Sequence, residues 1–318
     1  MLDPAILADL ERVEVGLEAA TESESPFVSE AASYLVHAGG KRIRPLLVLL
    51  AAQFGDPTRP EVIPAAVSVE LTHLATLYHD DVMDEAPLRR GRPSPNARWG
   101  NSVAILTGDF LFARTSAILA DLGPEAVRIQ AETFERLCIG QILETVGPQD
   151  GQDPVEHHIR VLADKTGSLI SAACRYGALM SGCDEATIET LARYGDAVGV
   201  AFQLADDLVD ITSESEQSGK TPGTDLREGV PTLAPLIALS GTDVADVRLR
   251  ELLSRPLPDD AEHAEALALL RGHAAVAQAQ DEARRWATIA RSELATLPDI
   301  PARQALEMVC DFVVSRTG

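Results

Sequence analysis

Apolar residues recur with helical spacing along almost the whole of this 318-residue chain. Between Glu61 and Asp84 they mark one face of a helix. They are Val62, Ala65, Ala66, Val69, Leu74 and Leu77. Short alternating runs between hairpin turns, the usual signal of strands, are missing. The pattern predicts an all-α fold, a large bundle of ten or more helices. No change in composition suggests a linker, so residues 1–318 are predicted to form a single domain.

Helix ends can be placed where capping and breaking residues occur. Asn101 is expected to cap a helix that stops at Gly123, and Pro124 then opens another helix that stops at Gly147. The segment 218–232 is rich in Gly, Pro and Thr and is predicted to be a loop. Further helices are predicted near 154–165, 167–182, 184–213, 231–240, 243–254, 260–294 and 301–315.

The chain is strongly acidic. It has 27 Lys and Arg residues against 49 Asp and Glu residues, so its net charge is −22. This charge argues against a nucleic-acid partner and against binding to anionic lipid surfaces. An anionic substrate would therefore have to meet a local basic pocket.

The sequence also suggests a location in the cell. The N-terminus is acidic where a signal peptide needs positive charge. The longest apolar run, which begins at Pro45, has about half of the roughly 20 residues that a membrane span needs. The cysteines form no CxxC pair, which argues against a zinc or redox site. We expect a cytoplasmic protein without an integral membrane segment.

The pattern DDxxD occurs twice, at 80–84 and at 206–210. Its first and last carboxylates lie four residues apart, on one face of a helix, where like charges repel. A bound cation relieves that repulsion, and oxygen ligands suit Mg²⁺. A single such cluster is more often a solvated helix end. Here both copies follow strongly apolar runs, which places them at the mouth of the core and favours metal binding.

Basic residues occur in matching places. Lys and Arg bind phosphates, so these positions are candidates for phosphate contacts, although any one of them could be an ordinary surface charge. His73 lies about two turns before Asp80 on the same helix face and could pack in the core or donate to a phosphate. The basic candidates are Lys41, Arg42 and Arg44 in GGKRIRP, then Arg89 and Arg90, Lys165 beside Thr166, and Lys220.

These motifs, in this order, resemble the trans-prenyl diphosphate synthases of the polyprenyl synthetase family, and especially their longer-chain members. The resemblance covers residues 39–229. It is carried by GGKRIRP, ELTHLATLYHDDVMDEAPLRRGRPS, LTGDFLFA, DKTGSLI, FQLADDLVDI and GKTPGTDLREG. It implies a helical bundle of the isoprenoid synthase type around an elongated central cavity. It also implies Mg²⁺-dependent condensation of isopentenyl diphosphate with an allylic diphosphate, giving a trans-polyprenyl diphosphate of twenty carbons or more, and a homodimer.

The resemblance also implies roles for individual residues. Three Mg²⁺ ions per site would be held by Asp80, Asp84 and Asp206. The remaining cluster residues, Asp81, Asp207 and Asp210, would complete the metal-binding set, the last two as supporting carboxylates. Lys165, Lys220 and Arg89 would neutralise the leaving diphosphate. Thr166 and Gln203 would turn oxygen dipoles toward the allylic carbocation. Isopentenyl diphosphate would be held by Lys41, Arg44, His73 and Arg90.

One position departs from the family pattern. Many relatives carry a second lysine in the loop after the second cluster, where this chain has Val230. A supporting contact is therefore missing, although Lys220 and both clusters remain.

Product length depends on what blocks the path of the growing chain. Ala75 and Thr76, five and four residues before Asp80, are small, whereas relatives with short products often have a bulky aromatic there. We therefore expect a long product and a deeper floor made by Phe134 or Leu137. The alternative is that a neighbouring helix packs closely against Ala75 and Thr76.

The same motifs bear on other functions. A short-chain farnesyl or geranylgeranyl diphosphate synthase stays open. A class I terpene cyclase would lack GGKRIRP and the second DDxxD, and a non-catalytic partner subunit would have eroded clusters. A di-iron bundle needs two Glu-x-x-His motifs, and only Glu70–His73 occurs.

Overall fold

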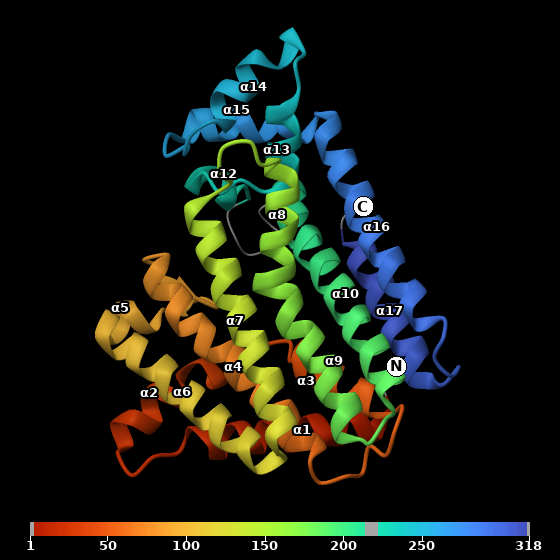
Figure 1. Ribbon diagram of the computed structural model, residues 1–318. Helices are drawn as coiled ribbons and strands as arrows, with labels where there is room; N and C mark the ends of the chain where they lie inside the picture. Colours follow the sequence, from red (N-terminus) through yellow and green to blue (C-terminus); the bar gives the residue numbers. More distant parts are fainter. Residues whose placement is uncertain (1–2, 214–221, 317–318) are drawn as a thin grey trace. The chain divides into compact units, whose positions relative to one another are not determined.

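The computed structural model describes residues 3–213 and 222–316, and these are predominantly helical, which confirms the predicted all-α class (Figure 1). Lys220 lies outside the described residues. The chain divides into two compact units. The first contains residues 1–134, 169–192 and 297–305, and the second contains residues 135–168, 193–296 and 306–318.

The first unit is organised around α4 (Val62–Met83), which contacts several neighbouring helices. They are α1 (Pro4–Thr21), α3 (Ile43–Ala52), α5 (Pro95–Trp99) and α6 (Asn101–Leu122), while α2 (Pro26–His37) packs on α1 and α6. Helix α4 is buried on nearly all sides, which fits a helix whose side chains are mostly apolar all round. Its Tyr78 is fully buried and donates to the carbonyl oxygen of Ala31 on α2.

Helices α4 and α6 lie side by side and approach closely at Gly108 (Figure 1). A Cβ atom at this position would stand 2.4 Å from the ring of His79 and 3.1 Å from the carbonyl oxygen of Ala75. Any larger residue would have to displace the His79 ring and press on the backbone of α4. The predicted cap of α6 is shifted by one residue, because Gly100 is the N-cap and Asn101 is already helical.

A hairpin follows α4, although the sequence predicted no strands. Strands β1 (Leu88–Arg89) and β2 (Arg92–Pro93) are antiparallel and are joined by Arg90 and Gly91. Both turn residues have positive φ, 52° and 74°, as the tightest hairpin turns require. The strands were missed because two residues are too few to show an alternating pattern.

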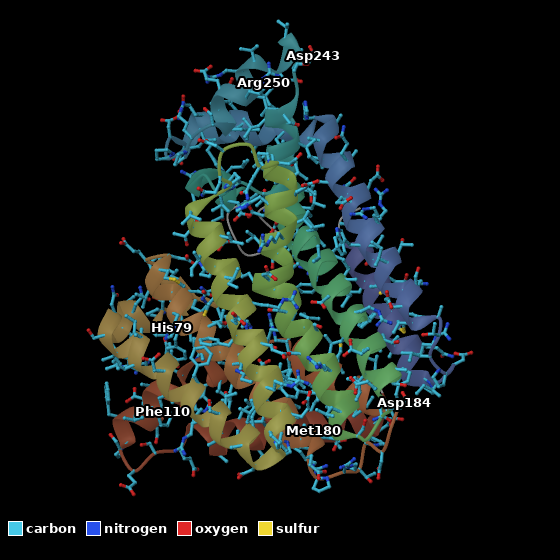
Figure 2. All side chains as sticks on the ribbon, in the orientation of Figure 1. His79, Phe110, Met180, Asp184, Asp243 and Arg250 are labelled. Carbon is cyan, nitrogen blue, oxygen red and sulfur yellow. The ribbon has the colours of Figure 1, made fainter. Side chains whose placement is uncertain are left out.

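Three further long helices contribute residues to the first unit. They are α7 (Pro124–Val146), α9 (Ser168–Met180) and α10 (Glu185–Thr212). Helices α7 and α10 also contribute residues to the second unit. Figure 2 labels Met180, which ends α9, and Asp184, whose carboxylate accepts from the backbone N–H of Thr187 at 2.8 Å and so caps α10.

The second unit has its own apolar core, to which Leu204, Leu226, Leu252 and Leu270 contribute. Helix α13 (Leu233–Ser240) lies at its centre and contacts four other helices. These are α8 (Pro154–Leu162), α14 (Val247–Leu253), α15 (Asp260–Arg271) and α16 (Ala274–Leu294). Asp243 and Arg250, labelled in Figure 2, lie around the short 3₁₀ turn η2 (Val244–Asp246) and α14. Among the described residues, this unit also contains α12 (Thr224–Glu228) and most of α17 (Pro301–Ser315).

Two predicted boundaries in this unit were wrong. The single helix expected over 260–294 is two helices, because the helix is interrupted at Gly272 and His273. The His273 ring caps the second helix by accepting from the N–H of Ala275 at 3.1 Å. The helix expected over 154–165 ends at Leu162 and continues as the π-helical turn η1 (Ala163–Gly167).

One helix in the described part of the chain, α6, is long and apolar enough to cross a membrane by length and composition alone. A third of that window is buried, and its outward side chains include Ile105 and Leu106. A helix that packs inside a soluble protein passes the same test.

Candidate active site

The first aspartate cluster forms the C-terminal end of α4. Asp80 and Asp81 lie in its last turn, and Asp84 is the exposed C-cap, whose N–H bonds to the carbonyl oxygen of Asp80 at 2.8 Å. Asp81 is fully buried and forms an ion pair with Arg89 at 2.6 Å. The predicted metal ligands Asp80 and Asp84 therefore lie one turn apart, while Asp81 anchors the hairpin to α4.

Burial raises the pKa of the Asp81 carboxyl group, although the hydrogen bond and the charge of Arg89 act to lower it. The second carboxylate oxygen, Oδ2, is buried without a hydrogen-bond partner in the described residues. Arg89, predicted to hold the leaving diphosphate, is tied to this carboxylate in the structure.

Three arginines and one histidine lie beside this cluster in the same unit, and we call Arg42, Arg44, Arg90 and His73 the basic cluster. Arg42 is the N-cap of α3 with a left-handed φ of 49°. It forms ion pairs with Glu14 at 2.5 Å and with the buried Glu70 at 3.0 Å. Arg42 is therefore a structural residue that holds the Gly-rich turn in place.

Arg44 and Arg90 form no salt bridge within the described residues. The Nε atom of Arg44 is buried without a hydrogen-bond partner, and burial lowers the pKa of this guanidinium. Arg90 donates to the carbonyl oxygen of Leu35 at 3.2 Å. Its guanidinium packs over Gly40, where a Cβ atom would lie 3.2 Å from it. Lys41 lies next to Arg42 in this turn and is exposed.

His73 completes the basic cluster. Burial and the nearby arginines, Arg44 first among them, hold the pKa of this imidazole well below its ordinary value. His73 is therefore neutral at pH 7 and can donate one N–H to an anion. The structure thus places Arg44, His73 and Arg90 near one another. Within the described residues, the half-buried Arg44 and the exposed Arg90 have no carboxylate in a salt bridge.

The second aspartate cluster ends α10 in the second unit. Asp206 is partly exposed and forms an ion pair with Arg316 at 2.6 Å. Asp207 accepts from the amide of Gln203 at 3.0 Å, and His158 lies 3.7 Å from its other oxygen. These contacts leave Asp206 the more accessible ligand of the pair.

Asp210 has a different role in the structure. Its carboxylate accepts from the backbone N–H groups of Thr224 at 3.3 Å and Asp225 at 3.1 Å. It therefore caps α12 and fixes the position of the chain after the loop. This agrees with a supporting carboxylate better than with a direct metal ligand.

Lys165 and Thr166 lie in the π-helical turn η1 of the same unit. The Lys165 ammonium pairs with Glu144 at 2.5 Å, and the Thr166 hydroxyl donates to the side-chain oxygen of Gln203 at 3.4 Å. Gln203 in turn donates to Asp207, so these polar groups form one connected set. The sequence did not identify the partners Glu144, His158 and Arg316, because none of them lies in a recognisable pattern with the residue that it contacts.

Both clusters consist of carboxylate oxygens, the ligands that Mg²⁺ and Ca²⁺ prefer. Within the described residues, no three His, Cys, Asp or Glu side chains gather closely enough to hold a metal ion alone. The carboxylate pair of either unit would have to be completed by oxygens from elsewhere. Substrate phosphates provide such oxygens, so the residues fit a metal that binds together with a diphosphate.

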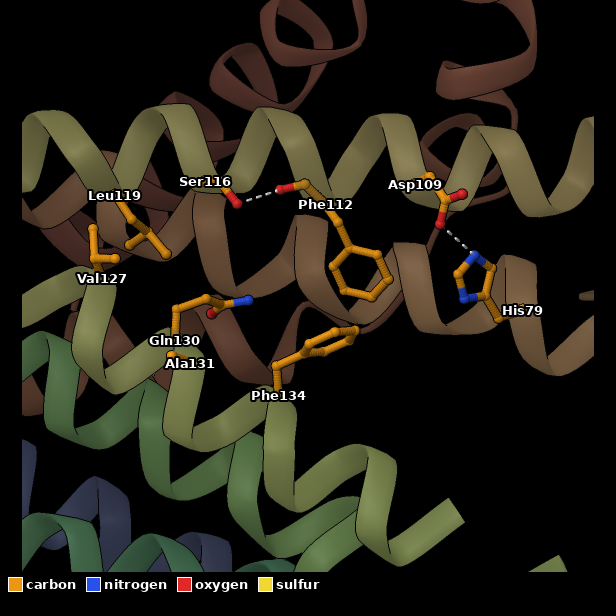
Figure 3. Close-up of a pocket in the computed structure, with 9 residues that line it drawn as sticks. All are labelled: His79, Asp109, Phe112, Ser116, Leu119, Val127, Gln130, Ala131 and Phe134. Atoms are coloured by element: carbon orange, nitrogen blue, oxygen red, sulfur yellow. Dashed lines mark hydrogen bonds and ion pairs between the residues drawn. The ribbon is translucent and has the colours of Figure 1, made fainter. Parts of the chain in front are cut away.

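An apolar cavity of 380 Å³ lies in the first unit, between the end of α4, α6 and the start of α7 (Figure 3). Phe112 and Phe134 face each other there at 4.6 Å between ring centroids, and His79 lies 5.7 Å from Phe112. His79 also pairs with Asp109 at 3.4 Å. Gln130 also lines the cavity and donates to the hydroxyl of Thr72, two turns before Asp80.

The predicted chain-length residues have different positions. Phe134 lines the cavity and is 38% exposed, so its role as a floor for the growing chain stays a prediction. Ala75 is fully buried, with its carbonyl oxygen against Gly108, which supports close helix packing as the reason for its small size. Thr76 is half-buried on the next position of α4. Leu137 is buried on α7 and belongs to the second unit.

The family model for polyprenyl synthetase matches residues 25–270. The chain belongs to the polyprenyl synthetase family. A nonaprenyl diphosphate synthase of Mycobacterium tuberculosis is 51% identical over 317 residues, which covers 99% of this chain and 94% of that protein. These findings confirm a prenyltransferase of the trans-prenyl diphosphate synthase type, and a longer-chain member.

Solved structures of family members agree with this assignment. A geranylgeranyl pyrophosphate synthase from Corynebacterium glutamicum, complexed with calcium and isoprenyl diphosphate, has a TM-score of 0.90 and 45% identity, and the match covers 99% of this chain and 98% of that one. A decaprenyl diphosphate synthase from Rhodobacter capsulatus has a TM-score of 0.90 and 35% identity, with the same coverage. The isoprenoid synthase fold is therefore confirmed, and divalent-metal binding in the family is consistent with the two carboxylate clusters.

Proposed function

We propose that this polyprenyl synthetase condenses isopentenyl diphosphate head-to-tail with an allylic diphosphate, in the presence of Mg²⁺, to give trans-polyprenyl diphosphates of twenty carbons or more. The basic cluster carries the proposal. The buried Nε of Arg44 has no hydrogen-bond partner in the described residues, and it lies near Arg90 and a neutral His73. A bound anion would supply the missing hydrogen-bond acceptor. This anion site is distinct from the carboxylate clusters, so two diphosphates can be recognised by different chemistry.

In this proposal, the basic cluster holds the diphosphate of isopentenyl diphosphate. Arg44 and Arg90 supply planar guanidinium donors, which match phosphate oxygens well. His73 donates one further hydrogen bond, and Lys41 adds a mobile charge at the exposed edge. Glu70 and Glu14 are already paired with Arg42, so they do not oppose the incoming anion.

The allylic diphosphate is assigned to the aspartate clusters. Asp80, Asp84 and Asp206 would hold Mg²⁺, whose charge, when bound, offsets that of the departing diphosphate. Lys165 and Lys220 contact the same diphosphate in this scheme, and Arg89 keeps Asp81 in place. A cytoplasmic location and a single domain over residues 1–318 are further parts of the same proposal.

The chain's own residues then account for each step. Lys165 stabilises the diphosphate as its bond to the allylic carbon breaks. The backbone of Lys165–Thr166 and the side-chain oxygen of Gln203 stabilise the allylic carbocation with their dipoles. The alkene of isopentenyl diphosphate, held by the basic cluster, attacks that carbon and forms the new carbon–carbon bond. The released diphosphate, an anion left beside the reacting carbons, is assigned the final proton.

Diphosphate release tests the proposal against a terpene cyclase. A synthase releases diphosphate rapidly only when isopentenyl and allylic diphosphates are both present. A cyclase releases it from the allylic diphosphate alone at an equal rate. Both aspartate clusters are intact, which argues against a non-catalytic partner subunit, and such a subunit would release none in either mixture.

Separate sites predict separate kinetic effects. His73→Ala or Arg90→Ala should raise the apparent KM for isopentenyl diphosphate more than the KM for the allylic primer, because each removes one contact to the first diphosphate. Lys220→Ala should do the reverse. Steady-state kinetics with one substrate varied at a time measures both values. Equal changes in both KM values for all three variants would contradict the assignment.

A homodimer is part of the proposal, with each subunit keeping its own site. It is supported by the exposed apolar side chains Ile105 and Leu106 on α6, which a second subunit would cover. Light scattering at micromolar concentration should therefore give about twice the mass of the chain. Leu106→Asp should lower that mass by placing a charge in the contact, and a wild-type monomer would contradict the prediction.

A further inference from the structure

The π-helical turn η1 is held by a side chain that no motif indicated. Arg136, on α7, donates from Nε to the carboxylate of Asp164 at 3.0 Å. It also donates from one terminal nitrogen to Asp196 on α10 at 3.0 Å, and from the other to the carbonyl oxygen of Ala163 at 3.1 Å. One guanidinium therefore links α7 to the first two residues of η1 and to α10, all within the second unit.

Charge in this contact is locally balanced. Asp164 and Asp196 together neutralise Arg136 and the nearby Arg160, which lies 3.8 Å from Asp164. The two carboxylates outweigh the effect of burial and raise the pKa of Arg136. A lysine here would keep the charge but could not offer the fixed fork of donors to three acceptors in different directions.

Two glycines allow the turn to lie as close as it does. A Cβ atom at Gly140 of α7 would stand 2.6 Å from the backbone nitrogen of Lys165 and 3.0 Å from the carbonyl carbon of Asp164. A Cβ atom at Gly167 would stand 3.2 Å from the carbonyl oxygen of Asp196. The turn is thus pressed against two helices and has little room to move.

The turn itself has the geometry of an interrupted helix. The N–H of Ser168 bonds to the carbonyl oxygen of Ala163, five residues back, and the Ser168 hydroxyl donates to the carbonyl oxygen of Asp164 at 2.5 Å. Such turns are costly unless their surroundings hold them, and they often occur at functional positions. Lys165 and Thr166 lie at its centre, between the fixed ends.

We propose that Arg136 is a positioning residue for the prenyl transfer reaction, which, with Asp164 and Asp196, holds η1 so that Lys165 and the Lys165–Thr166 backbone face the breaking allylic bond. The inference rests on the proposed function. Arg136 touches neither substrate in this account. Its removal should lower the rate of ionisation while substrate binding at the basic cluster is unchanged.

The test compares Arg136→Gln with Arg128→Gln. Arg128 lies on the same helix, is exposed, and pairs only with Glu125 and Glu132 of that helix. Arg136→Gln should lower kcat at least about tenfold, which corresponds to about 1.4 kcal/mol, with the KM for isopentenyl diphosphate changed less than about twofold. Arg136→Lys should recover only part of the loss. Arg128→Gln should keep wild-type kcat.

Two further readouts separate positioning from folding. Calorimetric titration with isopentenyl diphosphate should give the same stoichiometry for Arg136→Gln and wild type. An equal number of binding sites per chain shows that the variant is folded, so the loss of kcat is not a loss of folded protein. The slow solvolysis of the allylic diphosphate without isopentenyl diphosphate should fall by the same factor as kcat, because ionisation is the shared step.

A second variant displaces the turn from the other side. Gly140→Ala places a methyl group against the backbone of Lys165 and improves the helix propensity of α7. It should lower kcat and solvolysis together without loss of helical circular dichroism. Wild-type kcat in both Arg136→Gln and Gly140→Ala, or a loss of titration stoichiometry equal to the loss of kcat, would overturn the inference. A wild-type enzyme that performs no condensation would defeat the proposed function instead.

Discussion

Asp80→Ala and Asp206→Ala are each expected to reduce turnover to less than about a tenth of the wild-type value at saturating Mg²⁺, a loss of more than about 1.4 kcal/mol. Each variant removes a carboxylate at the start of one aspartate cluster. A lost metal ligand weakens the stabilisation of charge on the departing diphosphate, which costs several kcal/mol in such sites. The measurement is the initial rate of condensation with both substrates saturating.

The fold should survive both substitutions. Asp80 and Asp206 lie in the last two turns of their helices at partly exposed positions, where removal of a carboxylate leaves no buried cavity. Circular dichroism should therefore be unchanged. Asp121→Ala, at an exposed position on α6, is a matched control and should keep full turnover. More than about a tenth of wild-type turnover in either cluster variant would show that the metal assignment is wrong.

Product length should change most when the cavity beside α4 is altered. Phe134→Ala removes one of the two aromatic rings that close this cavity and should lengthen the product. Thr76→Phe adds bulk one turn before Asp80 and should shift the product toward fifteen or twenty carbons. Each isoprene unit buries five carbons, at about 0.8 kcal/mol per methylene, so one unit is worth about 4 kcal/mol of burial.

Chromatography of the reaction products measures this distribution. Phe110→Ala is the matched control, since Phe110 lies on α6 under the guanidinium of Arg114 and does not line the cavity. Ala75→Tyr is expected to shorten the product too, but it also forces an aromatic ring against α6 near Gly108, so it should lower the melting temperature. If Phe134→Ala and Thr76→Phe both leave the distribution unchanged, the cavity does not hold the growing chain.

The fold class followed from the sequence because long helices show their period clearly. α4 is an example, with its apolar residues in register over the whole element. Shorter features were not predictable. The β1–β2 hairpin depends on two residues with positive φ, and the break between α15 and α16 depends on a single histidine cap. Neither feature gives a periodic pattern in the sequence, because each is set by the local backbone conformation and by local hydrogen bonds.

The site was predictable where its chemistry is concentrated in a short motif. The aspartate clusters and the group of Arg44, His73 and Arg90 could be named because each residue lies in a recognisable pattern. Partner choice was not predictable. Arg89 binds Asp81, eight residues earlier, and Arg136 contacts Asp164 and Asp196, 28 and 60 residues away. Such pairs depend on how the helices pack, and spacing along the sequence carries no information about them.

The most direct test of the account is chromatography of the products formed from labelled isopentenyl diphosphate. We expect labelled polyprenyl diphosphates of twenty carbons or more when an allylic primer and Mg²⁺ are both present, and no labelled product when the primer is omitted or the metal is removed with a chelator. Labelled product without a primer, undiminished product in the presence of chelator, or a wild-type product that stops at fifteen carbons would contradict it.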